Sequence, residues 1–138
     1  MDDGELASVL ALREAVFCAE QGVPIDLERD GQDAGALHVV AARGREIVGT
    51  CRLLDDNPEW RLGRMAVRRD QRGHGVGALL LAEAHRLAAD AGAHAVQLAA
   101  QIPVRSFYER YGYVAWGEEF MEAGIPHVMM TRTIEGAD

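Results

Sequence analysis

A glycine-rich stretch near the middle of the chain has the composition of a phosphate-binding site. The segment RRDQRGHGVGALLL (68–81) places Gly73, Gly75 and Gly77 at alternate positions, between a charged run and an apolar helical pattern. The first N–H groups of a helix lack partners within the helix and carry partial positive charge. Glycines remove the Cβ atoms that would keep a bulky anion away from these groups. The pattern therefore predicts an anion site, for which phosphate is the usual ligand.

Three phosphate-binding patterns compete for this segment. The P-loop pattern G-x-x-x-x-G-K-[ST] fails because the segment contains no lysine. The dinucleotide pattern G-x-G-x-x-[GA] matches through Ala78, but no acidic residue ends the following predicted strand and the chain is short for that fold. The pattern [RQ]-x-x-G-x-[GA] fits at every position from Arg72 to Gly77. A glycine-rich turn without a ligand is the remaining alternative.

The rest of the chain predicts the elements that must position this loop. Helical spacing of apolar residues predicts helices over 5–19, 76–91 and 104–112. Strand patterns cover 37–43, 46–53, 61–67, 95–100, 113–120 and 127–134. We expect 25–36 to be a polar, acidic loop and 55–60 a turn. On the helix 76–91, the apolar stripe comprises Val76, Leu79, Leu80, Ala84, Leu87, Ala88 and Ala91.

The order of these elements predicts the fold class. A strand, a helix and a second strand between 61 and 100 require a crossover, and hence a locally parallel strand pair. The strand pairs on either side are hairpins and therefore antiparallel. We expect an α/β fold with a mixed (α+β) sheet covered by helices.

The composition describes one soluble globular domain spanning 1–138, with 49% hydrophobic and 26% charged residues. The net charge of −8 and the lack of a basic stripe argue against a nucleic-acid partner. The acidic N-terminal segment carries no export signal, and no apolar run approaches the roughly 18 residues of a membrane span. We therefore expect a cytoplasmic protein with no membrane partner.

The spacing of cysteines and histidines predicts no metal site. Cys18 and Cys51 lack C-x-x-C spacing, and the five histidines lack H-x-x-x-H spacing. Cys51 lies in the middle of a predicted strand with no strong base evident nearby. We expect it to be a small buried hydrophobic residue rather than a nucleophile.

The glycine loop and its flanking elements resemble the GNAT superfamily of acyl-CoA-dependent N-acyltransferases. LGRMAVRRDQRGHGVGALLL (62–81) is similar to the family's central strand, pyrophosphate loop and helix. QIPVRSFYERYGYV (101–114) is similar to its later signature N-x-x-A-x-x-x-Y-x-x-x-G-[FY]. Tyr108, Gly112 and Tyr113 match that spacing, whereas Gln101 and Val104 replace the common asparagine and alanine.

The two ends of the chain resemble a small bacterial branch of uncharacterised GNAT proteins. The similar pieces are LREAVFCAEQGVP (12–24), an E-x-D-x-x-D pattern and GIPHVMM (124–130). Together with the central motifs, the resemblance covers nearly the whole chain. The family's usual first strand has no counterpart ahead of the helix predicted over 5–19. The resemblance implies a GNAT-like fold in which two parallel strands splay apart.

The resemblance also implies that acetyl-CoA is the co-substrate. Its pantetheine arm would pair with the main chain from Met65 to Val67, which includes Ala66, and Gln101 would make a polar contact with the arm. Its pyrophosphate would rest on the amides of the loop, formed by Arg72, Gly73, His74, Gly75, Val76 and Gly77. We expect the His74 side chain to face solvent.

The implied reaction is direct attack of an amine on the thioester. Tyr108 stands where the family has the acid that protonates the departing thiolate, and a packed aromatic ring is the alternative role. Glu20 is a candidate base, but a buried Arg13–Glu20 ion pair explains the same pattern equally well. Both side chains are therefore candidate acceptor-site residues.

Several further side chains are candidates for contact with the acceptor. Glu28, Asp30 and Asp33 form either a solvated loop face or a cage for a cationic acceptor. His38 and His127 each lie near the start of a predicted strand and are either structural or proton acceptors. Weaker candidates of the same kind are Glu118 and Glu119.

The sequence thus predicts an N-acetyltransferase that modifies a primary amine of a small molecule. One alternative is a non-catalytic acyl-CoA-binding sensor or scaffold domain, and another is a protein lysine acetyltransferase. A homodimer paired through the C-terminal hairpin is common in the family and is a further expectation.

Overall fold

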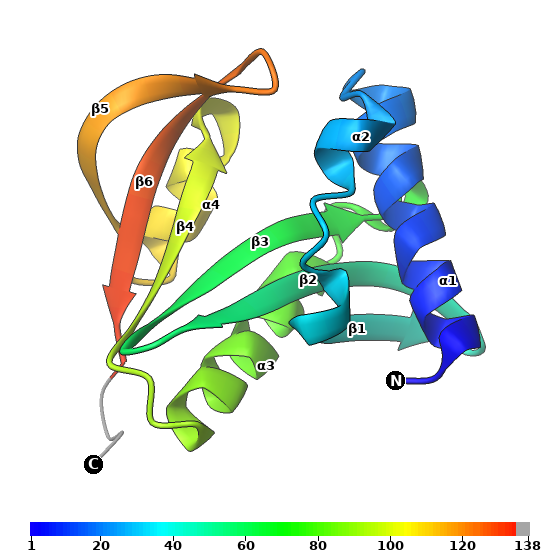
Figure 1. Cartoon of the computed structure of the whole chain (residues 1–138), viewed down its shortest axis with the longest axis horizontal. Helices are drawn as coiled ribbons and strands as arrows, with labels where there is room; N and C mark the ends of the chain where they lie inside the picture. The colour runs from blue at the N-terminus through cyan, green and yellow to red at the C-terminus, as the bar shows by residue number, and fades with distance from the viewer. Residues whose placement is uncertain (135–138) are drawn as a thin grey trace.

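A six-stranded mixed sheet in the order β1-β2-β3-β4-β6-β5 forms the centre of the protein (Figure 1). The computed structural model describes residues 1–134. The strands are β1 (Leu37–Arg43), β2 (Glu46–Asp56), β3 (Glu59–Val67), β4 (Ala95–Gln101), β5 (Val114–Glu122) and β6 (Ile125–Thr133). Within residues 1–134, β3 and β4 are the one parallel pair, and the four other pairs are antiparallel. The predicted mixed sheet with one crossover is therefore confirmed.

The hairpin between β2 and β3 is tighter than predicted. We expected a turn over 55–60, but β2 continues to Asp56 and β3 begins at Glu59. Asp55 pairs with Trp60 and Asp56 pairs with Glu59 in the antiparallel register. The turn is therefore confined to two residues, because the strand ladder extends through charged positions that the apolar pattern did not include.

Two parts of the helical prediction were wrong. The first helix is α1 (Asp3–Arg13) followed by a wider π-helical segment (Glu14–Glu20), not one regular α-helix over 5–19. The segment 25–36 is not an irregular loop, because it contains α2 (Ile25–Glu28) and a 3₁₀ turn (Asp33–Gly35). Pro24 precedes α2, and its carbonyl accepts hydrogen bonds from two N–H groups of that short helix.

The remaining helices are α3 (Val76–Asp90) and α4 (Arg105–Arg110), with 3₁₀ turns at 69–71 and 102–104. They pack against one face of the sheet through the main core, whereas α1 covers the other face through Leu12 and Val16. The buried face of α3 comprises Leu80, Leu81, Ala84 and Ala88. Leu79 is 68% exposed and Ala91 is exposed, so the predicted stripe was wrong at these positions.

The strands β3 and β4 diverge, and this divergence positions the site (Figure 1). They pair at three positions only, Glu59–Ala95, Trp60–Val96 and Arg61–Gln97. Beyond Arg61, the β4-facing backbone of β3 has no strand partner within residues 1–134. The expectation of splayed parallel strands is therefore met.

A bulge in β3 reverses which face its side chains occupy. Gly63 pairs with Arg52 and Ala66 with Thr50, so two residues of β3 stand opposite one residue of β2. Arg64 in the bulge has a positive φ of 52°. Leu62 consequently packs in the α3-side core, whereas Ala66 packs beneath α1. The bulge thus changes which face of the sheet the side chains of β3 occupy just before the glycine loop.

No helix within residues 1–134 has the length and apolar character needed to cross a membrane.

Candidate active site

The glycine loop links the end of β3 to the start of α3, as the sequence predicted. Gly73 and Gly75 have φ values of 79° and 80°, a left-handed conformation that residues with a Cβ adopt at a cost. Gly75 is the residue immediately before α3 and offers no capping side chain. The N–H groups in the first turn of α3 therefore have neither an intrahelical carbonyl nor a cap. They are the N–H groups at which the sequence pattern predicts an anion site.

Close packing fixes the start of α3 in place. A Cβ on Gly49 of β2 would lie 2.6 Å from Val76 Cγ1, and a Cβ on Gly77 would lie 3.1 Å from Phe107 Cζ. These glycines let α3 approach the sheet and α4 more closely than any other residue would allow. The N–H groups of the loop are therefore held rigidly next to the open edge of β3.

The side chain of Arg72 turns back toward α1 rather than out over the loop. Its Nε donates to the carbonyl of Val67 at 3.0 Å, and its guanidinium pairs with Glu20 at 2.8 Å. The hydrogen bond from Arg72 lowers the pKa of Glu20, whose side chain is 26% exposed. Of the two alternatives for Glu20, the buried ion pair with Arg13 is therefore wrong. The π-helical segment between the two residues rotates Glu20 away from the face that carries Arg13.

Tyr108 lies on α4 beside the diverging strands. Its hydroxyl is 3.8 Å from the sulfur of Met65 on β3, and its ring packs edge-on against Phe107 and Tyr113. The side chain is buried, and burial raises its pKa above the usual value of a tyrosine. The phenol is therefore protonated at neutral pH.

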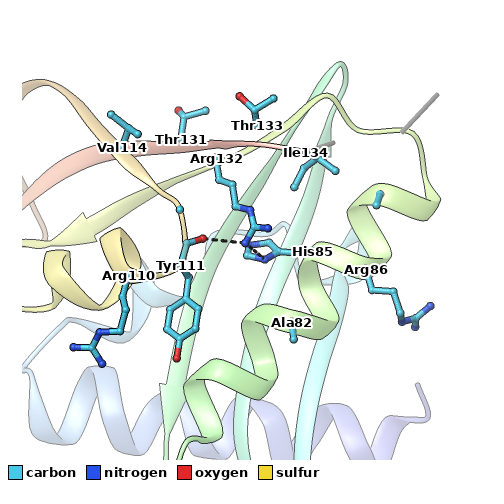
Figure 2. Close-up of a pocket in the computed structure, with 12 residues that line it drawn as sticks. Ala82, His85, Arg86, Arg110, Tyr111, Val114, Thr131, Arg132, Thr133 and Ile134 are labelled. Atoms are coloured by element: carbon cyan, nitrogen blue, oxygen red, sulfur yellow. Dashed lines mark hydrogen bonds between the residues drawn. The ribbon is translucent and has the colours of Figure 1, made fainter. Parts of the chain in front are cut away.

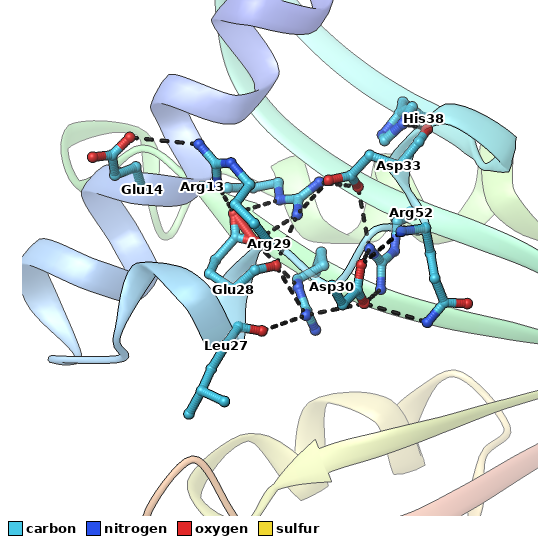
Figure 3. A network of polar contacts seen from close by, with 11 residues as sticks. Arg13, Glu14, Leu27, Glu28, Arg29, Asp30, Asp33, His38 and Arg52 are labelled. Carbon is cyan, nitrogen blue, oxygen red and sulfur yellow. Dashed lines mark hydrogen bonds and ion pairs between the residues drawn. The ribbon is translucent and has the colours of Figure 1, made fainter.

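A network of arginines and carboxylates joins the segment 25–36 to α1 and the sheet (Figure 3). Arg13, which is 0% exposed, donates from Nε to Glu28 at 3.1 Å and from Nη1 to Asp33 at 2.7 Å. Arg52 on β2 pairs with Asp30 at 2.7 Å. The hydrogen bond from Arg52 holds the pKa of Asp30 well below its usual range.

This network corrects the expectation for the acidic segment. Glu28 is buried and the three carboxylates are engaged by internal arginines, so they form neither a solvated face nor an unoccupied cage for a cation. Arg64 adds an ion pair to Asp30 at 3.3 Å. Arg52 and Arg64 were missed at the sequence level. The sequence did contain a signal for Arg52, because this charged residue interrupts the apolar run CRLL. A charge that is buried in a strand needs an oppositely charged partner.

The two candidate histidines lie on strands that are far apart in the sheet. His38 lies on the edge strand β1, and its Nε2 donates to the carbonyl of Asp33 at 2.9 Å. His127 lies on β6 in register with Gln101 of β4, and its Nδ1 is 2.6 Å from the carbonyl of Ile125. Gln101 in turn donates to Gln21, which follows the π-helical segment, at 2.9 Å. His127 and Gln101 thus lie together at the end of β4, and His38 does not join them.

The remaining candidates from the sequence are Cys51, His74, Glu118 and Glu119. Cys51 is 1% exposed, and burial raises the pKa of its thiol to about 12, which confirms its role as a buried hydrophobic residue. His74, Glu118 and Glu119 are exposed. Among residues 1–134, no three His, Cys, Asp or Glu side chains are grouped as metal ligands.

A hollow of about 900 Å³ lies between α3, the end of α4 and β6, away from the diverging strands (Figure 2). Arg132 points into it from β6 and donates to the carbonyl of Tyr111 at 2.9 Å and to His85 Nδ1 at 3.0 Å. His85 Nε2 is 2.7 Å from the hydroxyl of Tyr113. Burial, with a contribution from Arg132, lowers the pKa of His85 to about 4. Sequence reasoning missed this cluster, because the two residues of each hydrogen-bonded pair are separated by more than twenty positions.

Comparison with known proteins gives a consistent result. The family model of the acetyltransferase (GNAT) domain matches residues 3–134. YjcF of Bacillus subtilis, an uncharacterized N-acetyltransferase, is 34% identical, over 95% of this chain and 94% of its own. The crystal structure of an acyl-CoA N-acyltransferase from Pseudomonas aeruginosa is 33% identical, with a TM-score of 0.87 over 96% of this chain and 92% of that one.

A more distant structure shares the fold alone. An aminoglycoside 6′-N-acetyltransferase complexed with coenzyme A has a TM-score of 0.76 at 16% identity, over 96% of this chain and 92% of that one. The mixed sheet, the splayed strands, the glycine loop and these similarities lead to one conclusion. The chain belongs to the GNAT family of acetyltransferases.

Proposed function

We propose that the protein transfers an acetyl group from acetyl-CoA to a primary amine of a small molecule. One observation carries the proposal. The unpaired N–H groups at the start of α3 lie next to the part of β3 that is not paired with β4. The first feature suits a diphosphate and the second suits an extended amide-containing arm. The aminoglycoside acetyltransferase of the same fold was solved with coenzyme A, which supports the choice of cofactor.

In this proposal, coenzyme A runs from the loop into the gap between β3 and β4. The main chain from Met65 to Val67 binds the pantetheine arm, and the amides from Arg72 to Gly77 bind the pyrophosphate. Gln101, at the end of β4, provides a polar contact if it releases Gln21. The Glu20–Arg72 ion pair steadies the loop from the side of α1.

The reaction proceeds by direct attack. The amine nitrogen forms a bond to the thioester carbonyl carbon, and the C–S bond breaks as the tetrahedral intermediate collapses. Tyr108 donates its proton to the departing thiolate, because its hydroxyl lies beside Met65 in the gap. The overall change moves one proton from the amine to the sulfur.

Glu20 is a weaker candidate base than the sequence suggested, although it remains a candidate for contact with the acceptor. Its carboxylate is bound by Arg72 and its lowered pKa makes it a poor proton acceptor. A Glu20→Gln variant tests this. We expect a modest loss of coenzyme A affinity through the loop, with transfer rates at saturation largely retained.

The binding experiment compares two glycines with the same backbone conformation. Gly75 and Gly92 both have φ of 80°, and at both positions no atom lies within 4 Å of where a Cβ would be. The two glycines lie at opposite ends of α3. Gly75→Glu places a carboxylate against the bound phosphates and should weaken coenzyme A binding at least about 100-fold. Gly92→Glu carries the same backbone strain and should bind normally. Equal affinity of the two variants in calorimetric titration would refute the phosphate assignment.

The transfer experiment separates the enzyme from its rivals. Thiol release from acetyl-CoA is measured with a panel of small primary amines and with lysine-containing peptides. Transfer to a small amine supports the proposal, and transfer to peptides alone would favour a protein acetyltransferase. Tight coenzyme A binding without transfer to any amine would favour a sensor domain.

A further inference from the structure

We propose that His127 is the general base that removes the proton from the acceptor amine, and that Glu122 beside it stabilises the charge that His127 acquires. This inference rests on the proposed function and names a residue for the half of the reaction that Tyr108 does not perform.

The position of His127 places it on the acceptor side of the sheet. It stands opposite Gln101, the last residue of β4, at the end where β3 and β4 have diverged. Its neighbours Val128 and Met130, one and three residues on, belong to the core that faces α3 and α4. Because side chains alternate along a strand, His127 points to the opposite face, on which α1 packs. An amine approaching the thioester from that face meets His127 at the mouth of the gap.

The tautomer of His127 is set by the main chain. Its Nδ1 lies 2.6 Å from the carbonyl oxygen of Ile125. A carbonyl can only accept, so Nδ1 carries the hydrogen and the neutral ring keeps its lone pair on Nε2. The ring is stacked on Phe120, with centroids 5.8 Å apart and planes at 24°, and the residue is only 6% exposed. The basic nitrogen is therefore held in one orientation.

Glu122 is placed to assist once the proton has moved. Its Oε2 is 3.6 Å from Nε2, which is beyond the length of a hydrogen bond but close enough for strong attraction to an imidazolium. Its side chain is 56% exposed, so it can move aside for the incoming amine. The residues in register with His127 on the neighbouring strands are the neutral Gln101 of β4 and Phe120 of β5.

Most of the other candidate bases are bound by arginines, and Glu118 and Glu119 are exposed on the edge strand β5. Glu20 is bound by Arg72, and Glu28, Asp30 and Asp33 are bound by Arg13 and Arg52. His38 is on β1, at the far edge of the sheet from β4 and β6. Of the candidates singled out in the sequence, His127 alone combines a fixed basic nitrogen with a place at the divergence of the strands.

The proton balance is complete. The amine attacks the carbonyl carbon, Nε2 of His127 takes a proton from the nitrogen, and the C–S bond breaks. Tyr108 gives its proton to the thiolate. The imidazolium then loses a proton to solvent and the phenolate gains one, which returns both residues to their starting states.

The decisive variant is His127→Asn, because an asparagine amide can still donate to the carbonyl of Ile125 but has no basic nitrogen. After transfer to an amine has been established for the wild type, we expect kcat to fall about 100-fold or more, in line with the loss of a general base. The coenzyme A Kd and the Tm should stay close to wild type. His94→Asn, at an exposed histidine away from the gap, is the matched control and should leave kcat unchanged.

A second variant guards against a merely structural role. His127→Gly opens space for free imidazole, and added imidazole should restore transfer in a concentration-dependent way. His127→Asn with wild-type kcat, or with a loss confined to Tm, would overturn the assignment while leaving the acetyltransferase proposal intact. A wild-type protein that binds coenzyme A but acetylates no amine would overturn the proposed function, and this assignment with it.

Discussion

At the scale of single residues, the proposed mechanism separates a buried acid from a fixed base. Tyr108 is enclosed by aromatic rings with its hydroxyl near Met65, and burial raises its pKa. His127 is held by a main-chain carbonyl on the other side of the strand gap. A phenol that is protonated before the reaction and an imidazole with one basic nitrogen suit a reaction that moves a proton from nitrogen to sulfur.

The role of Tyr108 can be tested by removing one oxygen atom. In Tyr108→Phe the ring packing is retained, so coenzyme A affinity should stay within about twofold. The value of kcat should fall about 10- to 100-fold, because the thiolate must leave without its acid. Calorimetry measures the coenzyme A affinity, and steady-state kinetics measure kcat.

The matched control is Tyr111→Phe, at a half-buried tyrosine just beyond the end of α4. Its kcat should equal that of the wild type. A Tyr108→Phe enzyme as fast as this control would show that Tyr108 is only a packed ring.

At the scale of elements, the arginine–carboxylate network attaches the segment containing α2 to the sheet. Arg13 comes from α1, Glu28 from α2 and Arg52 from β2, so three elements meet at one set of charges (Figure 3). Removing one partner leaves a buried charge without compensation, which typically costs about 3–5 kcal/mol.

Glu28→Gln should therefore lower the free energy of unfolding by about 3 kcal/mol, because the Arg13 guanidinium loses its main partner in the interior. Urea unfolding measures the change. Glu14→Gln serves as control, since its 3.5 Å pair with Arg29 lies at the surface and should contribute less than about 0.5 kcal/mol. Equal loss in both variants would show that the network does not hold the segment.

The cluster around His85 predicts a pH dependence of stability. The pKa of His85 is lowered from 6.5 to about 4, so the folded protein binds this proton more weakly than the unfolded chain does. The contribution of neutral His85 is fully present above about pH 6.5 and is lost as the pH falls toward 4. Because the group is partly exposed, we expect about 1 kcal/mol between pH 7 and pH 5.

Unfolding of the wild type and of His85→Gln at both pH values isolates this contribution from that of the acidic residues. The glutamine amide can still donate to the hydroxyl of Tyr113 but does not titrate. The decline in stability from pH 7 to pH 5 should be smaller in the variant. An identical decline in both proteins would contradict the burial of neutral His85.

Local pattern predicted the elements well and their tertiary contacts poorly. The glycine loop, the helix after it and the strand pairs were foreseen, because periodicity and turn residues act over a few positions. The π-helical segment that turns Glu20 toward Arg72 was not, since an apolar stripe does not reveal a wider helical turn. The partners of Glu28 and His85 were also missed, because each depends on which distant elements come together.

At the scale of the whole molecule, the two faces of the sheet carry different parts of the candidate site. The face covered by α3 and α4 carries the glycine loop and Tyr108, and the other face carries α1, the arginine–carboxylate network and His127. The strands β3 and β4 diverge beyond Arg61 (Figure 1), and coenzyme A is proposed to run between them. A donor bound from one side can therefore meet an acceptor that arrives from the other.

The central claim is that main-chain donors from Arg72 to Gly77 bind the diphosphate of coenzyme A. Calorimetric titration of the wild-type protein with coenzyme A, and with its dephosphorylated pantetheine fragment, tests it most directly. We predict saturable one-to-one binding of coenzyme A, and binding of pantetheine at least about 100-fold weaker. Equal affinity for the two ligands, or no binding of coenzyme A at all, would contradict the account.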